Sequence, residues 1–196
     1  MLILVGAMAI VFIMDLALSP QMGVSLGSRL YFNRDAIFSG EIWRVFTFLF
    51  LPPESSLIFI VFALYLYYIL GSTLEREWGA FGFTLFYFLG AVGAIASGMI
   101  TGYATNYYLN MSLFLAFAIL NPDFELYLFF FVPIKMKWLA ILDGVLLGID
   151  FAYSSWRGRI ALLAALVNLL IFFTPQLVDR IKAMYRKWKW KRNFRK

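Results

Sequence analysis

Residues 80–102 read AFGFTLFYFLGAVGAIASGMITG, a stretch without a charged side chain. A helix needs about 20 mainly apolar residues to cross the hydrocarbon core of a bilayer, so this stretch predicts a membrane-spanning helix. Small residues recur along it at every fourth position: Gly90, Ala94, Gly98 and Gly102. Gly144 and Gly148 repeat the spacing further along the chain. Because small residues at this spacing let helices approach closely, we expect both ridges to lie at contacts inside one bundle, and a dimer seam is the alternative.

The composition of the whole chain agrees with a membrane protein. Of 196 residues, 63% are hydrophobic and only 14% are charged, whereas soluble domains are about half apolar and about a quarter charged. This balance excludes a soluble enzyme, a disordered linker and a secreted disulfide scaffold. The chain has no cysteine and no histidine, so a thiolate nucleophile, the usual general base and the commonest metal ligand are all absent. We therefore predict no cofactor and no metal site.

Working outward from residues 80–102, hydropathy predicts six spans. They are Met1–Leu18, Ser55–Gly71, Ala80–Gly102, Tyr107–Leu120, about residues 137–153 and about residues 158–178. The first lacks a basic flank and a small-residue cleavage site, which favours a span over a signal peptide, and its start at Met1 leaves room for a short preceding flank. The predicted fold is an all-α, polytopic six-helix bundle over residues 1–178, followed by a basic tail over residues 179–196.

Two of the predicted connections contain apolar segments of their own. Residues 19–54 carry charges of both signs and the apolar run Trp43–Leu51, which we expect to be helical, to lie at the membrane interface and to end at Pro52-Pro53. Residues 121–134 contain seven apolar residues before a proline, too few to span the membrane. We expect an interfacial segment there, either extended or half-helical.

The basic residues predict the orientation in the membrane. Nine of the seventeen Lys and Arg residues follow Val178, and positively charged flanks stay in the cytoplasm. Six spans then place both termini in the cytoplasm. Within the tail, residues 186–192 alternate basic and indole side chains, a pattern that suits anionic lipid headgroups beside a membrane helix. We predict the lipid bilayer as the partner of this tail, and no nucleic acid.

Three short motifs then occur in order along the chain. The first contains Gly40, Trp43, Arg44, Thr47 and Phe50; the second contains Gly71, Leu74, Glu75, Trp78 and Gly79; the third contains Asn121-Pro122, Phe129–Phe131 and Pro133-Ile134-Lys135. The first resembles the G-x-x-W-R-x-x-T-x-x-F signature in the first loop of the rhomboid superfamily, and the second resembles the G-x-x-L-E motif that closes its second span. The third is closer to Derlins than to rhomboid proteases. The resemblance covers most of residues 40–175 and implies a rhomboid-like bundle of six spans.

The same resemblance implies where a catalytic site would lie. Rhomboid proteases use a Ser in G-x-S-G on span four and a His on span six, and Asn and His on span two assist at the oxyanion hole. Here Ser112 lacks both flanking glycines, Leu162 or Ala165 falls at the position of the base, and Ala63 and Phe59 fall at the assisting positions. A serine hydroxyl without an adjacent base is a weak nucleophile. The comparison implies a pseudoprotease.

Polar side chains in apolar surroundings are the remaining candidates for function. Arg44 is costly in lipid unless it is paired, and Glu41, Glu54 or backbone carbonyls are the partners within reach. Glu75 either caps a neighbouring helix N-terminus or bonds Arg76. Arg44 and Glu75 can both be structural residues that position the loop and hold the bundle together. For Trp43 and Arg44, a second interpretation is that the first loop perturbs lipid or contacts clients.

Three polar residues lie within or near the predicted spans five and six: Asp143, Asp150 and Asn168. We expect Asp143 to pair with Asn168 or with a backbone group. Asp150, like Asp15, lies near a span end where it reaches water. Two interpretations stay open for this group, a polar surface that faces clients and a set of contacts between helices.

The favoured function is that of a catalytically inactive, Derlin-like rhomboid relative. The resemblance implies that it binds membrane-protein clients or helps to extract them, and a short fourth span with submerged loops would thin the bilayer locally. The alternatives are an unconventional intramembrane serine protease and a small transporter using Asp143 and Asp150, although the two halves show no repeat. Eukaryotic Derlins carry C-terminal motifs that recruit a cytosolic ATPase, which this tail lacks. We therefore expect a bacterial plasma membrane rather than the endoplasmic reticulum.

Overall fold

The computed structural model describes residues 1–23, 25–53, 56–128 and 132–173. The predicted basic tail at 179–196, Glu54 and Phe129–Phe131 lie outside these residues. The elements of the N-terminal half are α1 (Leu2–Met22), α2 (Gly27–Leu30), β1 (Phe32–Asn33), α3 (Arg34–Phe38), α4 (Arg44–Thr47), the 3₁₀-helix η1 (Phe48–Phe50) and α5 (Leu57–Thr101). They are followed by β2 (Tyr103–Ala104), α6 (Tyr107–Leu120), β3 (Glu125–Leu128), β4 (Val132–Lys135) and α7 (Met136–Tyr153). A last helix covers Trp156–Phe173.

The chain is mostly helical, but the expectation of an all-α protein needs a correction. β1 pairs with β2, and β3 pairs with β4, in two short antiparallel ladders. Both ladders lie in connections between helices, where backbone N–H and C=O groups lack helical partners and must find others. Within the predicted segment 121–134, residues 125–128 and 132–134 take the extended form of the two that the sequence allowed, and Trp43–Leu51 is helical through α4 and η1 as expected.

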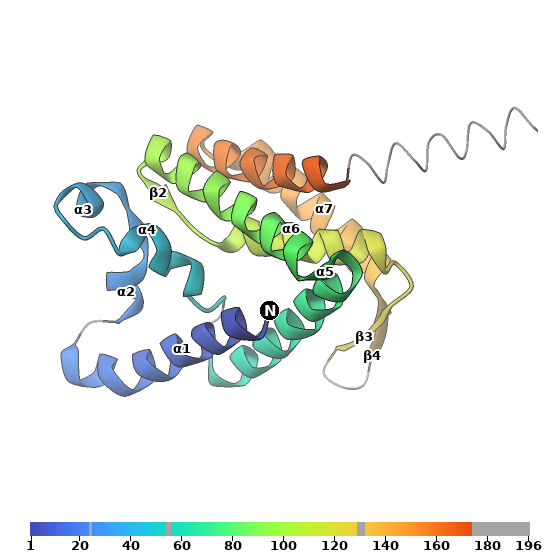
Figure 1. Ribbon diagram of the computed structural model, residues 1–196, viewed down its shortest axis with the longest axis horizontal. Coiled ribbons are helices and arrows are strands. Elements are labelled where there is room, and N and C mark those ends of the chain that lie inside the picture. Colours follow the sequence, from blue (N-terminus) through green and yellow to red (C-terminus); the bar gives the residue numbers. More distant parts are fainter. Residues whose placement is uncertain (24, 54–55, 129–131, 174–196) are drawn as a thin grey trace, which may run out of the picture.

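Helix α5 joins the predicted second and third spans into one 45-residue element with a kink at Gly79. Gly79 has φ 75° and ψ 162°, a conformation that only glycine adopts readily. The predicted second span ended at Gly71, but its helix continues through residues 72–78 as far as the kink. The kink folds the two halves of α5 back toward one another (Figure 1).

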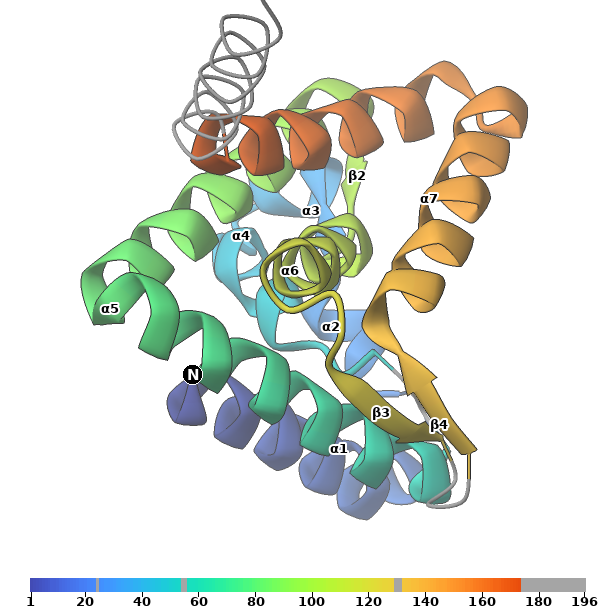
Figure 2. The ribbon, with the colours of Figure 1, turned by 90° about the vertical axis from the view of Figure 1, so that its right-hand side faces the viewer.

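Helix α6 occupies the centre of the molecule. Figure 2 shows it end-on, with α5 on one side, α7 on the other and the last helix across them. Its buried side chains include Leu113, Ala116 and Phe117, which pack with Leu74 and Phe86 of α5 in one apolar cluster. Helix α1 packs against α5. The short central helix is therefore surrounded by the longer ones.

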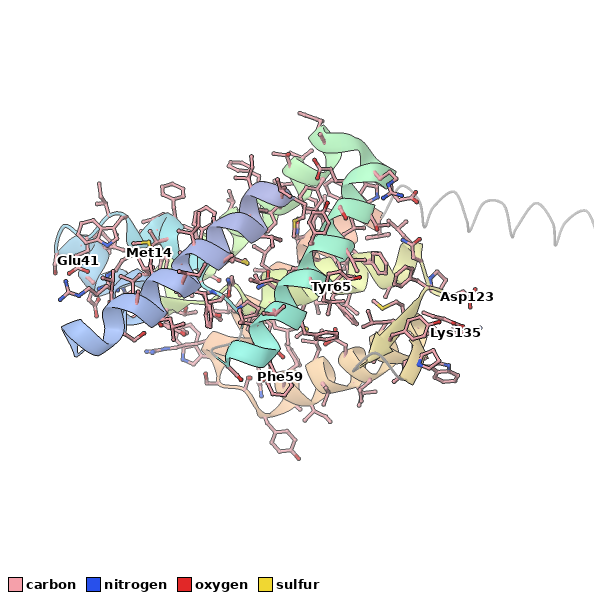
Figure 3. All side chains as sticks on the ribbon, turned by 90° about the horizontal axis from the view of Figure 1, so that it is seen from below. Met14, Glu41, Phe59, Tyr65, Asp123 and Lys135 are labelled. Carbon is pink, nitrogen blue, oxygen red and sulfur yellow. The ribbon has the colours of Figure 1, made fainter. Side chains whose placement is uncertain are left out.

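The connections gather at two opposite ends of the molecule. The first loop, with α2, α3 and α4, lies at one end beside β2, and the hairpin β3–β4 lies at the other (Figure 1). Figure 3 shows the same separation between Glu41 of the first loop and Asp123 and Lys135 near the hairpin. Among the described residues, two helices are long and apolar enough to cross a membrane, Phe59–Thr101 and Trp156–Phe173, and Leu2–Leu18 and Tyr107–Leu120 are shorter apolar helices.

The predicted ridge on α5 lies at internal contacts at Gly90 and Gly98 but not at Gly102, and the predicted ridge on α7 does not lie at such contacts. A Cβ at Gly98 would lie 2.6 Å from the Ala104 Cβ, and one at Gly90 would meet Leu109 and Asn168. In contrast, a Cβ at Gly144 or Gly148 would have no heavy atom of another residue within 4 Å. The prediction of a ridge on α7 is therefore wrong, because α7 turns its Asp143 and Leu147 face inward instead.

Candidate functional site

Arg44 organises the first loop. Its side chain is buried, its Nη1 donates to the carbonyl oxygens of Ser28 and Tyr31 at 3.1 Å each, and its Nε pairs with Glu41. The guanidinium also lies 5.1 Å from the centre of the Tyr31 ring. The sequence predicted Glu41 and backbone carbonyls as partners, and both are confirmed. A buried charge with this many partners fixes the path of the loop.

The other residues of the first motif divide between the inside and the outside of the loop. Thr47 donates from Oγ1 to the Leu30 carbonyl at 2.9 Å, so it joins Arg44 in holding the loop. Gly40 has φ 108° and lies in the turn at which the motif begins. Trp43, next to Arg44 in the sequence, is exposed on the surface. Only Trp43 among these is placed to meet lipid or another protein.

The second motif holds α1 against α5. Leu74 is fully buried in the core, and Glu75 Oε2 accepts from the Met1 ammonium at 2.8 Å. Gly71 faces the Met1 side chain, which leaves no room for a Cβ. Of the two roles predicted for Glu75, the structure has the one at a helix N-terminus, because α1 begins at Leu2.

Ser112 lies beside both residues that the resemblance aligned with the catalytic base. A very small cavity of about 10 Å³ is lined by Ser112, Leu162 and Ala165, together with Tyr108 and Leu147. Ser112 is buried and its Oγ donates to the Leu109 carbonyl at 2.7 Å. Its neighbours on the last helix are therefore aliphatic, and neither takes a proton from its hydroxyl. Phe59, aligned with an assisting position, is half exposed on α5.

Two of the predicted client-facing residues connect helices instead. Asp150 accepts from the Tyr108 hydroxyl at 2.7 Å and from the Ser154 hydroxyl at 2.6 Å, which ties the end of α7 to the start of α6. Asn168 donates from Nδ2 to the Phe86 carbonyl at 3.2 Å and so ties the last helix to α5. For Asp150 and Asn168, contacts between helices are the interpretation that the geometry favours.

Asp143 differs from both. Its Oδ2 is buried and has no hydrogen-bond partner among the described residues. The expected pairing of Asp143 with Asn168 or with a backbone group is therefore wrong for this oxygen, and the Asn168 Nδ2 donates to the Phe86 carbonyl on another helix instead. Asp15, in contrast, accepts from the Leu26 N–H and the Ser25 hydroxyl and holds the start of the first loop, rather than only reaching water.

Asp143 lines a cavity of about 320 Å³. The cavity is bounded by the first half of α5, by α6, by α7 and by Leu126 of β3. Its walls are mostly apolar, for example Leu66 on α5, Phe114 on α6 and Leu142 on α7. Leu142 and Leu146 on the α7 wall are both more than half exposed, so the cavity opens at the surface between helices.

Asn110 is a second polar residue of this cavity, and its role was not predicted from the sequence. Its side chain is only 4% exposed, lines the cavity, and carries an Nδ2 without a hydrogen-bond partner among the described residues. An amide inside the apolar run Tyr107–Leu120 was a visible signal. However, its direction depends on how α6 packs, which the run alone does not encode.

Comparison with known proteins adds no relative: no protein-family model matches the chain, and no curated protein matches it.

Proposed function

We propose that the chain is a catalytically inactive, Derlin-like relative of the rhomboid superfamily that binds membrane-protein clients in the bilayer and helps to extract them. The observation that carries the proposal is the cavity between α5, α6 and α7. It is apolar, opens between helices, and is large enough to receive side chains of a neighbouring transmembrane helix.

Several features support six spans with both termini in the cytoplasm. Each half of α5 on either side of Gly79 has about the 20 residues that a span needs. Outward-facing side chains such as Ile3, Phe81 and Ile171 are large, apolar and more than half exposed, as suits a lipid-facing surface. Lys135 and the first loop lie at opposite ends of the molecule (Figure 3), and the basic residues after Val178 favour a cytoplasmic C-terminus.

The length of α6 supports a role in thinning the bilayer. Its 14 residues rise about 21 Å at 1.5 Å per residue, which is shorter than the hydrocarbon core of about 30 Å. A short span accommodates mismatch by thinning the surrounding bilayer. A thinner bilayer lowers the cost of moving a client's polar segments across it, which is what extraction requires.

The protease alternative finds little support in the surroundings of Ser112. Its hydroxyl bonds to its own helix, and the facing side chains are those of Leu162 and Ala165. A transporter based on Asp143 and Asp150 is also disfavoured, since Asp150 is bonded to Tyr108 and Ser154.

The test of client binding uses two adjacent residues of α7. A photoreactive amino acid replaces either Leu142, which lines the cavity, or Ile141, which does not; both are exposed to a similar degree, 55% and 58%. Consecutive residues point about 100° apart around a helix. In proteoliposomes with a single-span client, we expect crosslinks several-fold stronger at position 142. Equal crosslinking at both positions would contradict binding in the cavity.

A further inference from the structure

Two residues that line the cavity between α5, α6 and α7 each carry a buried hydrogen-bonding atom without a partner, one a donor and one an acceptor. Asn110 is 4% exposed and Asp143 is 9% exposed, and both line the cavity. Asn110 Nδ2 and Asp143 Oδ2 are buried without a hydrogen-bond partner among the described residues. Apart from these two residues and Tyr67, every residue that lines the cavity is apolar.

Unpaired buried polar groups are costly, about 1–3 kcal/mol each, so a native structure that keeps two of them in one cavity calls for an explanation. Contacts between helices do not provide it here. Elsewhere in the bundle Asp150 and the Asn168 amide nitrogen make such contacts and are bonded. Four other buried side-chain atoms among the described residues also lack a partner, but none of them belongs to a residue that lines this cavity: Trp78 Nε1, Tyr87 Oη, Asn121 Nδ2 and Asn168 Oδ1. A ligand that brings both an acceptor and a donor would remove both costs at once.

We propose that this cavity selects clients whose transmembrane helix carries a carboxamide, Asn or Gln, within its apolar stretch. The client's side-chain carbonyl accepts from Asn110 Nδ2, and its NH₂ donates to Asp143 Oδ2. The inference rests on the proposed client-binding function and adds the chemistry of the client to it. In lipid, such a side chain has no water to bond, so interhelical partners are its alternative.

Other client side chains fit this pair less well, because of the donors and acceptors that they carry. A lysine has only donors, so it meets Asp143 and leaves Asn110 unpaired with its donor facing a cation. A carboxylate has only acceptors, so it meets Asn110 and places a negative charge beside Asp143. A leucine satisfies neither. The expected order of affinity is Asn or Gln first, with Lys, Glu and Leu behind.

The experiment measures energy transfer between labelled protein and single-span client peptides in liposomes. The peptides are identical except for one central residue, which is Asn, Leu, Lys or Glu. We expect the Asn peptide to bind about tenfold more tightly than the Leu peptide, which corresponds to about 1.4 kcal/mol and suits two interhelical hydrogen bonds of about 0.6 kcal/mol or more each. Equal binding of the Asn and Leu peptides, or tighter binding of the Lys peptide, would overturn the inference.

Variants then assign the preference to the two residues. Asp143→Leu and Asn110→Leu should each reduce the ratio of Asn-peptide affinity to Leu-peptide affinity, whereas Asp143→Asn, which keeps an acceptor oxygen, should retain this ratio. Asn168→Leu is the matched control, because Asn168 is equally buried but does not line this cavity. A preference that persists in Asp143→Leu, or one that Asn168→Leu removes, would assign it elsewhere and contradict the inference.

The peptides are compared on the unaltered chain, so this test does not depend on whether a variant folds. It also distinguishes a failure of client selection from a failure of client binding. If the Leu peptide crosslinks at position 142 but binds as tightly as the Asn peptide, the selection is wrong and client binding stands. If no peptide crosslinks there, client binding in the cavity is wrong and the selection is wrong with it.

Discussion

Replacing Gly98 by alanine is expected to destabilise the bundle, whereas the same replacement at Gly144 is expected to be neutral or stabilising. Both glycines lie inside helices, α5 and α7. The new Cβ at position 98 would lie 2.6 Å from the Ala104 Cβ and 2.7 Å from the Phe32 ring, which is fully buried and therefore cannot move aside without disturbing its neighbours. At position 144 the Cβ would meet nothing within 4 Å.

The magnitudes follow from these distances. Overpacking a well-packed site costs about 1–3 kcal/mol, and about 1 kcal/mol shifts the melting temperature of a chain of this size by about 2–4 °C. Gly98→Ala should therefore lower the melting temperature by about 2–12 °C. Gly144→Ala should gain up to about 1 kcal/mol, because alanine is the better helix former.

The assay is thermal unfolding of both variants in the same detergent micelles. Phe88→Leu, at an exposed position of the same helix as Gly98, controls for changes on the outer face of α5. If Gly98→Ala proves as stable as the unaltered chain, or if Gly144→Ala is the more damaging of the two, the packing around β1 and β2 is not as described and the reasoning fails.

Three further predictions address the loop, the α6–α7 contact and catalysis. Arg44→Leu should lower stability by about 1–3 kcal/mol because it leaves the carbonyls and Glu41 without their donor, while Trp43→Leu should leave the melting temperature within about 1 °C; a ranking in the opposite order would count against the loop geometry. Tyr108→Phe, which removes the hydrogen bond to Asp150, should cost about 1–2 kcal/mol in the same assay, and no loss would indicate that this bond does not hold the two helices. In liposomes with a generic rhomboid transmembrane substrate, neither the unaltered chain nor Ser112→Ala should cleave the substrate. Loss of a single oxyanion donor alone lowers the catalytic rate about 100- to 1,000-fold. Cleavage that depends on Ser112 would refute the pseudoprotease proposal.

Much of the helical framework is readable from the sequence because it depends on local apolar runs. The run Tyr107–Leu120 coincides with α6, and Gly79, which closes the second motif, is where α5 kinks. The β1–β2 pair was not predictable in this way, because it joins Phe32 and Ala104 across most of the first half of the chain. The outward direction of Gly144 was equally hidden, since spacing alone does not say which neighbour a helix face meets.

The site was predictable to a smaller extent. A charge in apolar surroundings is costly unless it is paired, so the need of Arg44 for partners could be predicted from its chemistry. That the carbonyls of Ser28 and Tyr31 are among these partners could not. The proximity of Ser112 to Leu162 and Ala165 followed from the resemblance. The unpaired atoms of Asn110 and Asp143 depend on how three helices surround one cavity, and no single segment of the sequence contains that information.

The most direct test of client binding is a substitution that fills the cavity with a large side chain. Leu146 lines it and Val145 does not, yet the two neighbours on α7 are exposed to nearly the same degree, 53% and 55%. The measurement is the dissociation constant of a single-span Asn client in liposomes for Leu146→Trp and for Val145→Trp. The account predicts at least tenfold weaker binding for Leu146→Trp and unchanged binding for Val145→Trp; equal affinities for the two variants would contradict it.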